Sequence, residues 1–130
     1  MTLETSTLLE RAKDNLLAAR KLHAGDYPDF AVLHACDVIF LIAMAMLQQA
    51  GVMGARHPFL SRMLSEVLVK PGRVSGEYQR YLLEAESARR LADDNLSDTL
   101  THDDAVRYIT NASNFLKLAE THFNEQTSAD

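Results

Sequence analysis

Asp37 is the side chain in this sequence whose type and setting most suggest chemistry. It lies within the run ACDVIFLI, where burial of an unpaired carboxylate would be costly. The carboxylate must therefore lie on an exposed strip, pair with a cation or belong to a site. His34 precedes Asp37 by three residues, so on a helix the two share one face. We expect them to form a local pair or a polar strip at a subunit interface, or to line a cleft that also holds Arg89.

Basic side chains are the next candidates. His57 follows Arg56 and begins a predicted helix, whose free N–H groups can hold an anion. The alternative is that His57 only caps this helix through a local hydrogen bond. Arg89 and Asp93 are four residues apart, which is also the spacing of an ordinary surface ion pair of small energetic weight.

Charge is unevenly distributed along the chain. Between positions 56 and 73 there are four basic residues and one acid, whereas positions 93–104 hold five aspartates and no Lys or Arg. Such runs are usually solvated faces. A sharper interpretation is a basic lip, formed by Arg56 and Arg62, that holds a phosphate or an RNA backbone.

The common catalytic signatures are absent from the sequence. It contains no Gly-rich phosphate loop, no His-Glu-x-x-His, no Gly-x-Ser-x-Gly and no zinc-spaced Cys/His cluster. The Glu-x-x-His pattern of di-iron helical bundles is also missing. The sequence therefore predicts neither a metal nor a cofactor, and it assigns no residue a catalytic role.

The size and composition are those of one globular domain in a reducing compartment. The chain has 130 residues, of which 47% are hydrophobic and 24% charged. Cys36 is the single cysteine, which fits a cytoplasmic protein, as does the lack of a signal-like N-terminus. The longest apolar run, 38–47, is too short to span a bilayer. A net charge of −5 argues against general affinity for nucleic acid or anionic membranes.

Apolar residues recur three or four apart along most of the chain, which predicts an all-α up-down bundle of four to five helices. The predicted helix starts have capping residues at Thr7, Asp26 and Thr101. Glycines end the helices, and we expect Gly25 to be a left-handed C-cap. The expected ranges are 5–23, 26–49, 58–69, 75–93 and 101–123. Positions 1–123 form one domain, and 124–130 form a flexible tail. The second helix is apolar nearly all round, so we expect it at the centre.

Several short motifs resemble the HEPN superfamily in order and spacing. Gly25-Asp26-Tyr27, AVLHA at 31–35 and AMAML at 43–47 are similar to the second helix of HEPN proteins. The resemblance extends over about 9–123 to a small, uncharacterised prokaryotic branch, in which a His begins a short helix, as His57 does here. An Arg-x-x-Ala-Asp-Tyr motif of that branch is matched by RRLAD at 89–93, with Asp94 in place of the Tyr. The acidic start of its last helix is matched by THDDA at 101–105.

The resemblance implies a helical bundle that is usually dimeric, with a cleft between protomers. Many members belong to toxin–antitoxin or phage-defence systems and are often encoded beside a minimal nucleotidyltransferase. Ribonuclease members use an Arg followed after four to six residues by a His. No Arg of this chain has that spacing: Arg20 precedes His23 by three residues, and Arg56 adjoins His57. The family also often has an Arg and paired Tyr residues in the second helix, where this chain has His34, Cys36 and Asp37.

Three functions agree with these observations. The leading one is a non-catalytic HEPN domain that dimerises and binds a nucleotidyltransferase, an RNA or a nucleotide. Its expected binding cleft consists of His34, Asp37, His57, Arg89 and Asp93. The first alternative is a metal-independent ribonuclease toxin, in which a histidine of this set is the base and the arginine stabilises charge. The second alternative is a purely structural helical adaptor.

Overall fold

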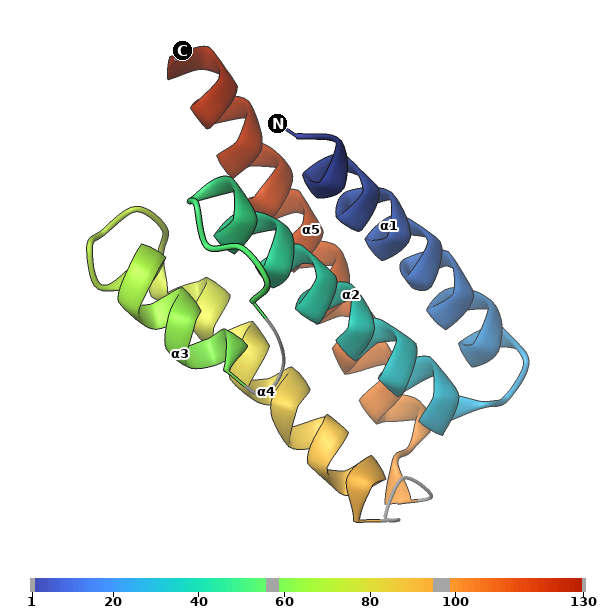
Figure 1. The fold of residues 1–130 in the computed structure, drawn as a ribbon. Coiled ribbons are helices and arrows are strands. Elements are labelled where there is room, and N and C mark those ends of the chain that lie inside the picture. Colours follow the sequence, from blue (N-terminus) through green and yellow to red (C-terminus); the bar gives the residue numbers. More distant parts are fainter. Residues whose placement is uncertain (1, 56–58, 95–98, 130) are drawn as a thin grey trace.

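The computed structural model describes residues 2–55, 59–94 and 99–129 and confirms the all-α prediction. No strand occurs among these residues. The helices are arranged as a bundle in which α1 begins and α5 ends at the same end (Figure 1). They are α1 (Leu3–Ala24), α2 (Pro28–Gln49), α3 (Leu60–Leu64) with its π-helical continuation η1 (Ser65–Val69), α4 (Gly76–Asp93) and α5 (His102–Ala129).

Helix α2 is the central element, as its composition predicts. It packs against α1, α3, α4 and α5, and 13 of its 22 residues are buried. The apolar part of this helix is longer than the ten-residue run at 38–47. An 18-residue window of the helix has a mean hydropathy of 2.3, which by length and composition is enough to cross a membrane. Since 67% of that window is buried inside the bundle, its apolar surface forms the protein core.

The start of α1 differs from the sequence prediction. The helix begins at Leu3, and the side chain of Thr2 accepts a hydrogen bond from the backbone N–H of Thr5. The expected capping residue, Thr7, lies within the helix, and its hydroxyl donates to the carbonyl of Leu3. The predicted capping box at Thr7 is therefore wrong, because Thr2 is in an extended conformation and starts the helix five residues earlier.

The turn between α1 and α2 places the left-handed residue one position later than expected. Gly25 has φ −88°, whereas Asp26 has φ +68°. The N–H of Asp26 bonds to the carbonyl of His23, and that of Tyr27 bonds to the carbonyl of Leu22. These bonds form a Schellman motif, in which the residue after the C-cap is left-handed. Asp26 therefore ends α1 and gives no side-chain cap to α2, whose N-cap is Tyr27.

The predicted helix at 58–69 consists of two short segments. Residues 56–58 lie outside the described residues, α3 ends at Leu64, and η1 continues it as a π-helical turn. The N–H of Lys70 reaches back five residues to the carbonyl of Ser65 at 2.8 Å. Sequence periodicity cannot predict this wider turn, because it adds only one residue to the helical repeat.

Helices α4 and α5 close the bundle through an aromatic cluster. Phe115 of α5 is fully buried, and its ring centroid lies 5.3 Å from that of Tyr78 and 6.0 Å from that of Tyr81. The Tyr78 hydroxyl donates to the carbonyl of Leu118 at 2.6 Å. These contacts fix the register of α4 against α5, and through it the position of Arg89 in the next turns of α4.

The start of the last helix confirms the predicted cap. The backbone N–H of Thr101 donates to Oδ2 of Asp104, and the N–H of Asp104 donates to the Thr101 hydroxyl, which is a reciprocal capping box. The backbone of α5 remains helical to Ala129, beyond the domain boundary expected at position 123. Flexibility of the 124–130 tail stays a prediction.

Candidate functional site

An ion pair between α2 and α4 accounts for the carboxylate in the core helix. Asp37 Oδ1 accepts a hydrogen bond from Nη2 of Arg89, which comes from 52 residues further along the chain. The Arg89 guanidinium also lies 5.8 Å from the ring centroid of Phe40, one turn of α2 away. The two charged side chains remain 38% and 30% exposed, so the pair is half-buried at the surface of the bundle.

Arg89 therefore does not use the surface partner that its spacing suggests. Asp93 is exposed at the end of α4, and within the described part of the chain no ion pair links it to Arg89. The guanidinium turns across the helix interface toward Asp37, where a carboxylate on an apolar helix needs a cation most. The structure thus joins two of the predicted site residues and leaves Asp93 apart from them.

His34 binds α1 and not its helical neighbour Asp37. Its Nδ1 lies 2.9 Å from Oδ1 of Asn15, whose amide nitrogen donates to the carbonyl of Arg11. Because an amide oxygen only accepts, Nδ1 of His34 must carry the proton. In a neutral imidazole the other nitrogen, Nε2, then keeps a free lone pair and remains available as an acceptor or base.

A cleft between α1 and α2 is lined by one member of each of these two pairs. Its volume is about 310 Å³. Asn15, the partner of His34, and Asp37, the partner of Arg89, both line it. The other lining side chains are those of Arg11, Phe40, Leu41 and Met44. The cleft thus offers a cation, a carboxylate and an amide beside apolar walls, which suits binding of a polar ligand or of a partner side chain.

Cys36 is next to Asp37 in α2, and its thiol is buried. It is fully buried, and burial raises the pKa of its thiol to about 12. The positive charge of Arg89 lowers the pKa of this thiol, and the negative charge of Asp37 raises it, but burial is the largest cause. The thiol therefore stays protonated at neutral pH, which excludes it as a nucleophile.

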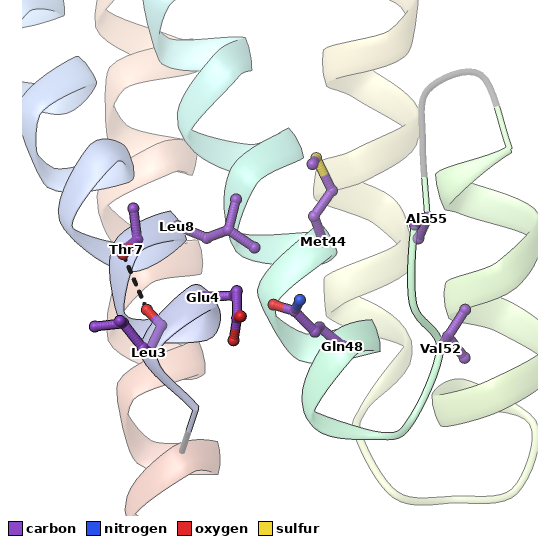
Figure 2. Close-up of a pocket in the computed structure, with 9 residues that line it drawn as sticks. Leu3, Glu4, Thr7, Leu8, Met44, Gln48, Val52 and Ala55 are labelled. Carbon is purple, nitrogen blue, oxygen red and sulfur yellow. Dashed lines mark hydrogen bonds between the residues drawn. The ribbon is translucent and has the colours of Figure 1, made fainter.

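A second, more apolar pocket adjoins the cleft at Met44. Its volume is about 390 Å³. Figure 2 shows it between the first turns of α1 and the end of α2, with Val52 and Ala55 on the far side. Thr5, buried beneath its α1 wall, donates a hydrogen bond to the Gln48 side-chain oxygen at 3.1 Å. The two pockets follow the same α1–α2 interface, so the polar cleft and the apolar pocket are neighbours on one side of the bundle.

The predicted basic lip is placed only in part. Arg62 of α3 is exposed and pairs with Glu66 at 3.3 Å, as neighbours one helical turn apart do. Arg56 and His57 lie outside the described residues. Of the predicted site residues, the structure pairs Asp37 with Arg89, whereas His34 contacts Asn15 and does not line the cleft.

Sequence reasoning missed Asn15 and Arg11. Their signal is the register of the α1–α2 hairpin, in which a residue on one helix faces its mirror position about the turn. Asn15 faces His34, and Thr5 faces Gln48. The two pairs are ten residues apart on α1 and fourteen apart on α2, so this pairing is only approximately symmetric about the turn. The register therefore brings the middle of α1 near the first turns of α2, but it does not by itself select Asn15 as the partner of His34.

Comparison with known proteins agrees with this architecture. The family model described as HEPN domain matches residues 5–122, nearly the whole chain. The chain belongs to the HEPN domain family. This HEPN domain is 28% identical over 120 residues to the UPF0332 protein glr0978 of Gloeobacter violaceus, covering 92% of the chain and 95% of that protein. The matched region extends from the first turn of α1 to His122 of α5 and includes the whole of α2, α3, η1 and α4.

Proposed function

We propose that this HEPN domain is a non-catalytic binding module of the cytoplasm. It dimerises and binds a protein partner, such as a nucleotidyltransferase, or an RNA or nucleotide, in a toxin–antitoxin or phage-defence setting. The observation that carries this proposal is the ion pair of Arg89 with Asp37, which engages the cation that an altered ribonuclease site would need.

Phosphodiester cleavage needs a cation that stabilises negative charge developing on the phosphate. Arg89 already donates to a carboxylate, and that carboxylate would repel an approaching phosphate. To act in catalysis, Arg89 would have to leave Asp37 without a partner in a half-buried position. Together with the missing Arg-to-His spacing, this favours binding over cleavage.

A metal-independent ribonuclease is the second candidate, because His34 keeps one ring nitrogen free. Because Nδ1 donates its proton to Asn15, Nε2 is the nitrogen that can accept a proton, as a general base must. His57 is the other candidate base. A purely structural adaptor is the third candidate, and it predicts that these side chains affect stability alone.

The deciding experiment is RNA cleavage by the purified protein in the presence of a chelator. Parent protein is compared with Arg89→Ala, His34→Ala and His57→Ala. Arg80→Ala serves as a matched arginine control on the same helix, because Arg80 is exposed and pairs with its helical neighbours Glu77 and Glu84. We expect no cleavage by any of them. Cleavage by the parent and the control, with loss in Arg89→Ala and in one histidine variant, would instead establish a ribonuclease.

Binding is tested by mass and by co-purification. We expect light scattering to give a dimer at micromolar concentration, and a nucleotidyltransferase encoded beside this chain to co-purify with it. Asp37→Ala should weaken that complex while Glu66→Ala leaves it intact, because Asp37 lines the cleft and Glu66 lies on the exposed side of η1. A monomer that retains neither the partner, RNA nor nucleotide would support the structural adaptor.

A further inference from the structure

The apolar pocket beside the cleft has the size and lining of a ligand site. Its volume of about 390 Å³ falls within the ~300–1,000 Å³ typical of small-molecule pockets. Apolar side chains supply most of its wall: Leu3, Leu8, Met44, Val52 and Ala55. The polar lining side chains are few, so their identity decides what the pocket accepts.

Glu4 supplies the charged group of the described lining, and the amide nitrogen of Gln48 is a neutral donor beside it. Figure 2 shows its carboxylate between α1 and α2, on the side of Gln48. The Thr7 hydroxyl already donates to the carbonyl of Leu3, and the Gln48 side-chain oxygen already accepts from Thr5. Within the part of the chain that the structure describes, no Lys, Arg or His forms an ion pair with Glu4.

Two other acids of α1 and α2 have a cationic partner, whereas Asp14 and Asp29, like Glu4, form no ion pair with a described residue. Glu10, two turns along α1, lies 3.7 Å from the ammonium of Lys13, and Asp37 pairs with Arg89. Glu4 thus presents a carboxylate without a cation at the edge of an apolar cavity. Because Glu4 is exposed, its attraction for a cation has the modest size of a surface ion pair, and burial of the apolar part of a ligand has to supply the rest of the affinity.

We propose that this pocket binds a cationic amphiphile, a small molecule with a medium-length alkyl chain and a protonated amine. The alkyl chain lies against Leu8 and Met44, and the ammonium group lies against Glu4. This site is separate from the Asp37–Arg89 pair, and it does not depend on whether the domain cleaves RNA.

The test compares octylammonium with octanol, which has the same chain and no charge, below the concentration at which either aggregates. Binding is followed by the methyl resonances of ¹³C-methyl-labelled methionine. Met44 lines the pocket, whereas Met46, two residues away, is fully buried on another side of α2 and is an internal reference. Met44→Leu and Met46→Leu assign the two signals.

We expect both probes to shift the Met44 methyl signal and leave that of Met46 in place. Octylammonium should bind about two- to fivefold more tightly than octanol, the range for an exposed ion pair. Glu4→Gln should abolish this preference without changing the affinity for octanol. Glu10→Gln, a matched change on the same helix that does not line the pocket, should retain it.

Three results would overturn the proposal. The first is the absence of any Met44 shift with either probe. The second is equal affinity of the parent for octylammonium and octanol. The third is an equal loss of preference in Glu4→Gln and Glu10→Gln, which would indicate general attraction to an acidic protein. Circular dichroism of both variants distinguishes these results from unfolding, and the RNA-cleavage outcome has no bearing on them.

Discussion

The ion pair between Asp37 and Arg89 should couple the stability of α2 to that of α4. The perturbation is a double-mutant cycle of Asp37→Ala, Arg89→Ala and the double variant. Fully exposed pairs contribute about 0.2–1 kcal/mol, and removing one partner of a buried pair costs about 3–5 kcal/mol. With 38% and 30% of the side chains exposed, this pair lies between these limits. We expect each single variant to lose about 1–2 kcal/mol, with a coupling energy of about 1 kcal/mol.

This loss corresponds to a measurable fall in melting temperature. Unfolding entropies of about 2.1 cal/mol/K per residue give about 0.27 kcal/mol/K for 130 residues. The single variants should therefore melt about 4–7 °C below the parent. Urea unfolding followed by circular dichroism gives the free energies, and the double variant should be little less stable than the worse single variant.

The exposed pair of Arg62 and Glu66 provides the matched control cycle. These side chains are 77% and 54% exposed and one helical turn apart, so their coupling should be at most about 0.5 kcal/mol. A coupling between Asp37 and Arg89 below about 0.3 kcal/mol, or no larger than that of the control, would refute the reasoning. It would mean that solvent screens the pair between α2 and α4 as fully as a surface pair.

Three further results are expected. Thr101→Ala removes the capping box with Asp104 and should lower the free energy of unfolding by about 1 kcal/mol in urea titration, whereas an unchanged midpoint would contradict the cap. Burial lowers the pKa of His122 from its usual value of 6.5, so the unfolded chain binds a proton more readily than the folded one. The stabilisation is therefore fully present above pH 6.5 and is lost as the pH falls through the lowered pKa of the folded state. His122→Gln should flatten this part of a series of urea midpoints measured from about pH 5 to 8. Cys36 should react with a thiol reagent at pH 8 only as fast as the fold opens, and rapid labelling of native protein would contradict its pKa of about 12.

Much of the fold followed from local patterns. The three-to-four spacing of apolar residues gave the helices, and the all-round apolar character of 28–49 gave its central position. The boundaries were less certain where two residues competed for one role. Gly25 can adopt the left-handed conformation at no steric cost, but the hydrogen bonds of the turn require it at Asp26.

Only part of the candidate site could be predicted from the sequence. Asp37 was identified because a carboxylate in an apolar helix needs an explanation, and this argument holds without knowledge of the fold. Its partner was not identified with certainty, because Arg89 had an equally well-spaced partner in Asp93. Asn15 was missed altogether, since nothing in its own segment distinguishes it from a solvated side chain.

The sequence by itself therefore determined the helices, the core face of each and the presence of a carboxylate, that of Asp37, in the apolar central helix. These are local properties, fixed by which side chains recur on one face of a helix. Only the tertiary structure decided that Asp37 meets Arg89, 52 residues away, and that His34 meets Asn15. Such pairings depend on the rotation and register of packed helices, which are set jointly by many side-chain contacts across each interface and by no single segment.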